Sequence, residues 1–219
     1  MMSNAHIAVG VASALALAQT GSVESCVAAV IGGSVGGLIA DCDITPSRAH
    51  KDALRGRLIV VAIAAAALAL DAYAQAGICA YLLDNLGVRL IAGVLLFAGL
   101  TFVGAHTEHR TFTHSLLAMA AFMAAVWLAC PPLVPFFAVG YGSHLVLDVT
   151  NKQPIRLLYP LKLKVSLGLC TARGAANKVT CVAGIAVAAV LLWYRMQPIA
   201  DTASVALSRL FGAFGSFCG

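Results

Sequence analysis

The sequence predicts an all-α protein, a polytopic membrane bundle of about five to seven transmembrane helices. Two observations support this prediction. Of the 219 residues, 61% are hydrophobic and only 11% are charged, whereas charged residues supply about a quarter of an ordinary soluble domain. The chain also contains several apolar runs that approach the roughly 20 residues needed for a helix to cross the hydrocarbon core.

The apolar runs fix the expected elements in chain order. Two early segments, Ile7–Ala18 and Val27–Ala40, are short and rich in Ala and Gly, so they could be tilted spans or re-entrant pieces packed inside the bundle. Clear spans follow at Leu58–Ala76, Leu90–Ala105, Ser115–Cys130, Leu133–Leu147 and Val179–Tyr194. No Lys or Arg precedes Arg48, so the first segment lacks the basic region of a signal peptide and is expected to be retained.

These spans predict one membrane domain over residues 1–195. Residues 196–219 form a C-terminal tail that could lie along the membrane interface as an amphipathic helix.

The basic residues predict the orientation of the bundle. With seven crossings, the segments 41–57 and 149–178 and the loop around Arg110 fall on one side and carry eleven of the fourteen Lys and Arg residues. Because cytoplasmic loops hold the excess of basic residues, this side is expected to face the cytoplasm. Such a basic collar can reflect topology alone, or it can attract anionic lipid headgroups.

The same face should gather most of the histidines and several aspartates. His144 and Asp148 are four residues apart, so on a helix they share one face and could bind one ion or simply hydrogen-bond to each other. Ionisable groups at membrane depth are costly, and their presence therefore indicates function. The residues concerned are His6, Asp41, Asp43, His106, His109, His114, His144 and Asp148.

The residue types indicate the kind of metal. The seven cysteines are scattered without a CxxC pair, which argues against a disulfide framework and a thiolate zinc site. Imidazole with carboxylate suits Zn²⁺, with Mn²⁺ or Fe²⁺ as alternatives, better than Ca²⁺ or Mg²⁺. The candidate ligands exceed what one tetrahedral ion needs, so more than one ion is expected. Such a centre activates water for hydrolysis, and the adjacent Arg110 could neutralise a phosphoryl oxygen.

Four segments resemble a known family. "NAHIAVG", the Asp-x-Asp at residue 41, "HRTFTHS" and "GSHLVLDVTNKQPIRLLYP" occur in the order seen in the YdjM-like family of membrane-bound, metal-dependent hydrolases, over roughly residues 4–160. Ala40 stands where the family has Pro, Thr111 replaces Gly, and Thr150 is one residue short of the family spacing with no Gly after it. These departures affect loop geometry more than ligands. The matching residues are His6, Asp41, Asp43, His109, Arg110, Thr113, His114, Ser115, Ser143, His144 and Asp148.

The resemblance implies the following site. His106 falls outside the family pattern and is expected to have a supporting or structural role. Arg110, Asp43 and Asp148 are the expected catalytic groups. The expected metal ligands are His6, Asp41, Asp43, His109, His114, His144 and Asp148.

The resemblance also implies a setting and a substrate class. The expected location is the bacterial inner membrane, and membrane lipids are expected partners. The cytoplasmic orientation expected for the site rests on the basic residues described above. The family is distantly similar to zinc-dependent phospholipase C and P1-type nucleases, which favours a phosphoester over a peptide. A membrane-embedded site then favours a lipid or lipid-linked phosphoester that arrives laterally, and nothing indicates nucleic-acid binding. Two alternatives stay open: a metal-ion or proton transporter using the same cluster, and a non-catalytic membrane module with a structural metal.

Overall fold

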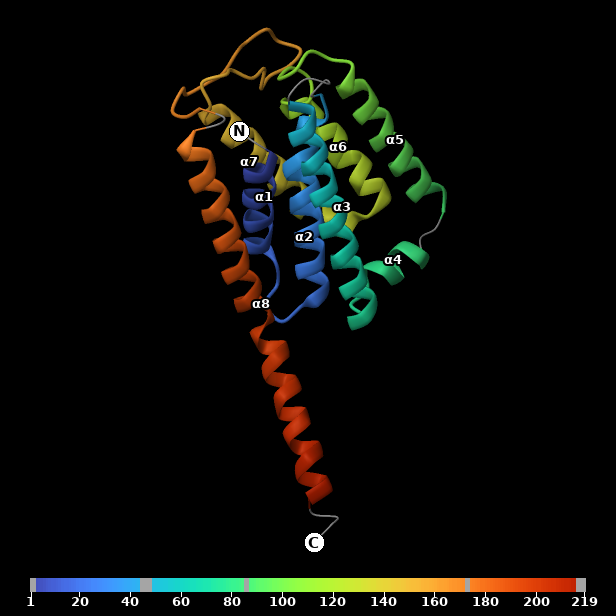
Figure 1. Ribbon diagram of the computed structural model, residues 1–219. Helices are drawn as coiled ribbons and strands as arrows, with labels where there is room; N and C mark the ends of the chain where they lie inside the picture. Colours follow the sequence, from blue (N-terminus) through green and yellow to red (C-terminus); the bar gives the residue numbers. More distant parts are fainter. Residues whose placement is uncertain (1–2, 44–48, 85–86, 172–173, 216–219) are drawn as a thin grey trace.

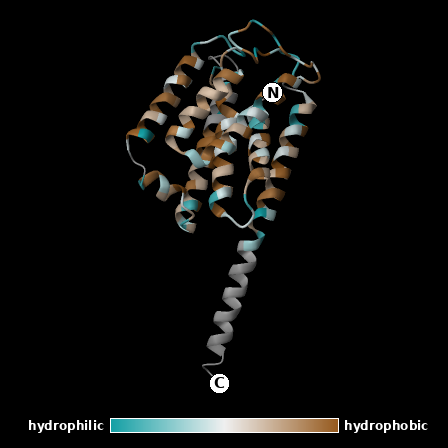
Figure 2. Cartoon of the chain, turned by 180° about the vertical axis from the view of Figure 1, so that it is seen from behind, coloured by the Kyte–Doolittle hydropathy of each residue, from teal (hydrophilic) through white to brown (hydrophobic). Residues whose placement is uncertain are grey.

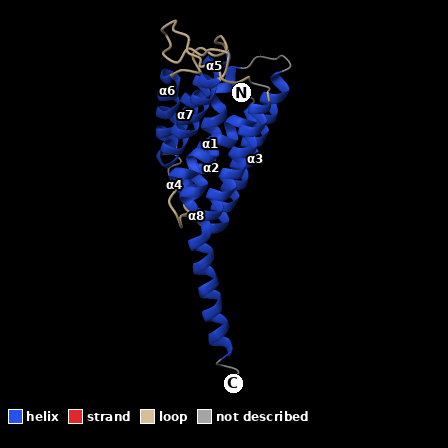
Figure 3. Ribbon diagram, turned by 90° about the vertical axis from the view of Figure 1, so that its left-hand side faces the viewer, coloured by secondary structure: helices blue, strands red, loops and turns tan. Residues whose placement is uncertain are grey.

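The computed structural model describes residues 3–43, 49–84, 87–171 and 174–215 (Figure 1). Within these ranges every named element is a helix (Figure 3). Two isolated β-bridges occur between residues 151 and 170. The predicted all-α class is confirmed. The elements are α1 (Ser3–Leu17), α2 (Val23–Ile39), the 3₁₀ turn η1 (Ala40–Asp43), α3 (Ala49–Ala74), α4 (Ile78–Asp84), α5 (Val88–Ala105), α6 (Leu116–Ala129), the 3₁₀ turn η2 (Pro131–Leu133), α7 (Val134–Thr150) and α8 (Ala175–Gly215).

Among the described residues, four helical segments are long and apolar enough to cross a membrane: Val23–Asp43, Val88–Ala105, Pro131–Thr150 and Ala175–Pro198. A fifth is added if α3 and α4, which bend by 91° at their junction, form one broken span. The helices α1 and α6 are apolar but have only 15 and 14 residues. At 1.5 Å per residue, each is about 22 Å long, shorter than the roughly 30 Å hydrocarbon core. These two short helices and the longer candidates account for the predicted five to seven segments.

The helix order brings several helix ends and loops together at one end of the bundle. The start of α1, the end of α2, the loop between α5 and α6 and the loop after α7 all lie at one end of the bundle (Figures 1 and 3). The helix α8 starts at this end and continues beyond the other end to Gly215, so residues 196–215 prolong a span helix. The interfacial position expected for this tail stays a prediction. Two of the basic residues that the sequence places on the cytoplasmic side, Arg48 and Arg173, lie outside the described residues.

Glycines on α2 allow three helices to pack closely. A Cβ atom at Gly33 would lie 2.6 Å from the carbonyl oxygen of Gly10 on α1, and one at Gly37 would lie 2.6 Å from that of His6. On its other face, a Cβ atom at Gly32 would lie 2.9 Å from the backbone nitrogen of Phe137 on α7. Small residues of this kind let membrane helices approach at backbone distance. They bring the His6 end of α1 and the C-terminal part of α7 against the end of α2.

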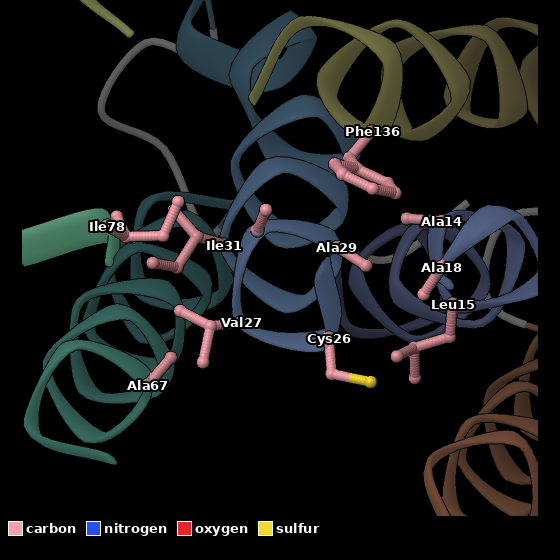
Figure 4. Close-up of a cluster of buried hydrophobic side chains, with 11 residues drawn as sticks. Ala14, Leu15, Ala18, Cys26, Val27, Ala29, Ile31, Ala67, Ile78 and Phe136 are labelled. Atoms are coloured by element: carbon pink, nitrogen blue, oxygen red, sulfur yellow. The ribbon is translucent and has the colours of Figure 1, made fainter. Parts of the chain in front are cut away.

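Two apolar clusters stabilise the bundle. One joins α1, α2, α3, α4 and α7 through residues such as Leu15, Val27 and Phe136 (Figure 4). The other contains Phe122 and Tyr141 together with Phe112 from the loop between α5 and α6. Many large hydrophobic residues of α3, α5 and α8 are exposed, and much of the helix ribbon has the hydrophobic colour in Figure 2, as expected for a surface in contact with lipid.

Candidate metal centre

Three imidazoles and two carboxylates meet at the end of the bundle where these loops lie. They come from four elements: α1, η1, the loop before α6, and α7. All five side chains are buried, with at most 7% of any residue exposed. We call this group the buried His/Asp cluster; its members are His6, Asp41, His114, His144 and Asp148.

The cluster has the dimensions of a metal site. Nε2 of His114 lies 3.0 Å from Oδ2 of Asp148, 3.4 Å from Nε2 of His144 and 3.7 Å from Oδ1 of Asp41. Nε2 of His144 lies 3.5 Å from the same Asp148 oxygen and 3.8 Å from the same Asp41 oxygen. Two ligands held about 2.1 Å from a tetrahedral zinc ion are about 3.4 Å apart. The donor atoms of Asp41, His114 and His144 form one group with metal-binding geometry, and Oδ2 of Asp148 lies within 3.5 Å of Nε2 of both imidazoles.

A hydrogen bond selects the nitrogen that His144 presents to the cluster. Its Nδ1 lies 2.8 Å from the carbonyl oxygen of Gly37. Because a carbonyl oxygen can only accept, Nδ1 carries the proton and donates it. The lone pair is then on Nε2, the atom that faces Asp41, His114 and Asp148. Metal-binding imidazoles are commonly oriented in this way through their second nitrogen.

His6 extends the cluster toward a second position. Its ring stacks on that of His144, with centroids 3.8 Å apart, and its Nε2 lies 3.5 Å from Oδ1 of Asp148. Its Nδ1 is buried and has no hydrogen-bond partner among the described residues, an arrangement that is costly for a polar group. Within the described ranges, three groups have metal-binding geometry, and His6, His144 and Asp148 form one of them. Asp148 thus directs its two oxygens toward two neighbouring positions.

Asp43 lies on the other side of His114. Its Oδ1 is 2.7 Å from Nδ1 of His109, and its Oδ2 accepts hydrogen bonds from the Thr113 hydroxyl at 2.7 Å and the Arg110 backbone N–H at 3.0 Å. The same oxygen is 3.5 Å from Nδ1 of His114, whereas the cluster lies at Nε2 of that ring. We call this group the Asp43 network: Asp43, His109, Arg110, Thr113 and His114. Asp43, His109 and His114 could hold a cation of their own. Alternatively, Asp43 could orient the His114 ring through Nδ1, the nitrogen that does not face the cluster.

The carboxylates dominate the electrostatics of His114. Burial by itself lowers the pKa of this imidazole, but Asp148, Asp41 and Asp43 around its two nitrogens outweigh burial and raise the pKa well above its usual value. The imidazole therefore holds a proton among the carboxylates when no cation is bound. A cation entering the cluster must displace that proton.

Arg110 connects the two groups. It has a left-handed backbone, with φ of 64°. Its guanidinium donates to the carbonyl oxygen of Gln153 at 2.6 Å and lies 3.4 Å from Oδ1 of Asp148. Its Nε is buried without a hydrogen-bond partner in the described part of the chain. A planar guanidinium next to a candidate cation site suits a phosphoryl or carboxylate group.

Comparison with known proteins identifies a family for this chain. The sequence profile of a family described as "YdjM inner membrane protein" matches residues 1–215. The chain belongs to this family. This match confirms the family resemblance that the four motifs indicated. The family description and the candidate spans also confirm the prediction of a membrane protein.

One curated relative of this YdjM family member is the uncharacterized protein YvsG of Bacillus subtilis (strain 168). The two are 32% identical over 90 residues, which cover 40% of this chain and 56% of YvsG. The chain thus matches only about half of that relative's length. No solved structure matches the chain.

The structure separates the predicted ligands of this YdjM family member by position. Five of them form the buried His/Asp cluster, while Asp43 and His109 lie in the neighbouring network, where the His109 side chain is 43% exposed. The Asp-x-Asp segment is a 3₁₀ turn. That turn directs Asp41 to the cluster and Asp43 to His109. His106 is exposed outside both groups, with Nδ1 2.8 Å from the carbonyl oxygen of Phe102.

Several supporting residues were not predicted from the sequence. The Ser3 hydroxyl donates to Oδ2 of Asp41 at 3.4 Å, and the Tyr141 hydroxyl donates to the carbonyl oxygen of Thr113. The spacing of Tyr141 from His144 and Asp148, three and seven residues along α7, could have indicated a shared face. Ser3 and the Gly37 carbonyl have no such signal, because their contacts arise from the packing of separate helices.

Proposed function

We propose that this YdjM family member is a membrane-embedded, metal-dependent hydrolase acting on the phosphoester of a lipid or lipid-linked substrate. The observation that supports this most directly is the geometry of the buried His/Asp cluster, in which donor atoms from separate elements lie 3.0–3.8 Å apart. Buried carboxylates need compensating positive charge. A bound cation would supply it in place of the His114 proton.

The donor set suits zinc, with manganese or iron as alternatives. His114, His144, Asp41 and Asp148 would hold one ion. A second ion would be held by His6 and the other oxygen of Asp148, which lies 3.5 Å from Nε2 of His6. When bound, such ions lower the pKa of water and place positive charge beside a phosphoryl oxygen.

The reaction would be hydrolysis of a phosphorus–oxygen bond. The oxygen of water joins phosphorus, the ester bond breaks, and the leaving oxygen takes a proton from that water to become an alcohol. Arg110 would donate hydrogen bonds to the phosphoryl oxygens, since its guanidinium lies next to Asp148 at the cluster. Asp43 would keep His114 and the Arg110 backbone in position.

The membrane setting supports a lipid-borne substrate. The cluster lies where the ends of α2 and α7, two candidate spans, meet the loops. The positive charge of the loops at this end favours a cytoplasmic orientation. A substrate anchored in the membrane would reach the site by lateral diffusion, and its phosphoester would be at the depth of the helix ends.

The test uses the full chain purified in detergent and reconstituted in lipid. Elemental analysis measures bound metal, and a panel of phosphoesters is assayed with and without chelator. Chelator-sensitive turnover supports the proposal. Bound metal with no turnover across the panel would favour a structural metal, whereas metal-ion flux into proteoliposomes would favour a transporter, in which broken helices near mid-bilayer are the usual site.

A further inference from the structure

A groove of about 590 Å³ lies between α2, α3 and α5, the three helices labelled in Figure 1. This volume is within the range of roughly 300–1,000 Å³ typical of ligand sites. One of the residues lining the groove is Asp41, a member of the buried His/Asp cluster. Two other grooves, of about 350 and 460 Å³, have no member of the cluster in their walls. The groove therefore lies next to the candidate metal centre, with Asp41 shared between them.

The walls of this groove are hydrocarbon. Leu38 and Ile39 come from α2, Val61 from α3, and Phe97 and Ala98 from α5. The hydroxyl of Thr101, which also lines the groove, donates to the carbonyl oxygen of Phe97 in its own helix at 2.8 Å. Such walls favour an apolar chain, because a polar ligand would lose its hydrogen bonds to water there.

The groove also opens outward from the bundle. Two of its lining residues are strongly exposed, Val61 at 64% and Phe102 at 67%. The helices α2 and α5 are candidate spans, and α3 is part of the bent one. In a membrane, the surroundings of these exposed residues are lipid chains. The groove thus joins the lipid phase to the cluster.

Asp41 marks the point where the apolar walls end. Its Oδ1 lies 3.7 Å from Nε2 of His114 and 3.8 Å from Nε2 of His144. A molecule with a hydrocarbon chain along α2 and α5 would therefore place the group attached to that chain at the buried His/Asp cluster. A lipid phosphoester has this arrangement, with an apolar chain next to an anionic head that complements a cation and the guanidinium of Arg110.

We propose that the groove between α2, α3 and α5 holds the hydrocarbon chain of a lipid phosphoester whose head lies at Asp41. The identity of the occupant as a substrate rests on the proposed hydrolase function. Binding of the lipid in the groove does not depend on that function, because a lipid can bind without being hydrolysed. The two can therefore be tested separately.

The binding test uses palmitoyl phosphatidic acid with a photoreactive diazirine on its chain, added to the full-length protein in phosphatidylcholine nanodiscs. After illumination, mass spectrometry locates the labelled peptides. Labelling should concentrate on the groove-lining parts of α2 and α5. Labelling spread over the outer helix faces, with no preference for the groove, would overturn the proposal.

Ala98→Trp places a large side chain in the groove, and Ala92→Trp is the matched control. Both alanines are exposed on α5, but only Ala98 lines the groove. Because the indole would fill space that the hydrocarbon chain needs, labelling of the groove should fall to the level of the outer helix faces in Ala98→Trp and stay at the wild-type level in Ala92→Trp. The same variant should lower turnover of palmitoyl relative to butyryl phosphatidic acid. Metal content serves as the folding control. It should stay at the wild-type level in both variants, which would show that the bundle is folded.

The outcomes separate the two proposals. Groove labelling that is lost in Ala98→Trp, without turnover of any phosphoester, supports the lipid site and contradicts the hydrolase. Turnover that is equal for long and short chains and unchanged in Ala98→Trp supports the hydrolase and rejects the groove as the chain site.

Discussion

The Nδ1 atom of His144 lies 2.8 Å from the carbonyl oxygen of Gly37, although 107 residues separate them in the chain. This contact requires the backbone of α2 to lie within reach of a side chain on α7. The glycines of α2 make that approach possible, because a Cβ atom at Gly32 or Gly33 would collide with a neighbouring helix. The orientation of a candidate metal ligand therefore depends on helix packing.

Gly37→Ala should destabilise the protein and weaken metal binding together. The added Cβ atom would lie 2.6 Å from the backbone oxygen of His6, and overpacking of this kind costs about 1–3 kcal/mol. Gly99→Ala on α5 is the control, because nothing lies within 4 Å of its Cβ position. Thermal unfolding in detergent and metal content are the measurements. Equal behaviour of the two variants would show that the close contact is unimportant.

His144→Ala and Asp148→Ala should each remove bound metal and turnover while the protein still inserts into the membrane. Loss of a ligand should reduce metal affinity by more than the roughly 10–100-fold typical of outer-shell residues. Elemental analysis after dialysis measures this. His106→Ala is the matched control, because His106 is exposed and lies outside the cluster. Wild-type metal content in either cluster variant would mean that the ligand set is wrong.

Asp43→Asn should weaken metal binding by about 10–100-fold without abolishing it. Its carboxylate faces Nδ1 of His114 and holds Thr113, whereas the cluster uses Nε2. A chelator-competition titration compares this variant with His114→Ala. Complete loss of metal in both variants would instead identify Asp43 as a direct ligand, as the sequence motif suggested.

Arg110→Lys should lower turnover by about 10²–10³-fold and leave metal content close to that of the wild type. Lysine keeps the positive charge but cannot form the two-pronged contact of a guanidinium with a phosphoryl group. Kinetic assays and elemental analysis are run on the same preparations. Arg156→Lys is the control, since that side chain lies 3.7 Å from the exposed Glu108 carboxylate. Metal loss in Arg110→Lys would assign Arg110 a structural role.

Zinc affinity should increase with pH through the neutral range. The pKa of His114 is raised well above its usual value by the surrounding carboxylates, so the proton is present below that pKa and leaves as the pH rises through it. Zinc competes with this proton, and displacement of one proton makes affinity rise about tenfold per pH unit. Calorimetric titration in buffers of different ionisation enthalpy counts the released protons. An affinity that is constant between about pH 6 and 8 would contradict this.

The fold class could be predicted from the sequence because membrane helices are specified by local composition. Windows such as Val88–Ala105 are apolar along their full length, and that property needs no tertiary information. The short helices are less well specified: for α1, with 15 residues, the sequence leaves a tilted span and a re-entrant piece open, and the clear span predicted at Ser115–Cys130 corresponds to α6, which has only 14 residues. The bend between α3 and α4 was not predicted; there Asp71 accepts hydrogen bonds from the backbone of Ile78 and Cys79.

The sequence by itself also determined which residues could form a polar site, because imidazoles and carboxylates are conspicuous in so apolar a chain. Only the tertiary structure decided their positions. It placed Nε2 of His114 in the cluster and Nδ1 against Asp43, and it joined Asp41 to an apolar groove. The physical reason is that these distances depend on how closely separate helices pack, and close packing is a property of pairs of surfaces rather than of either segment alone.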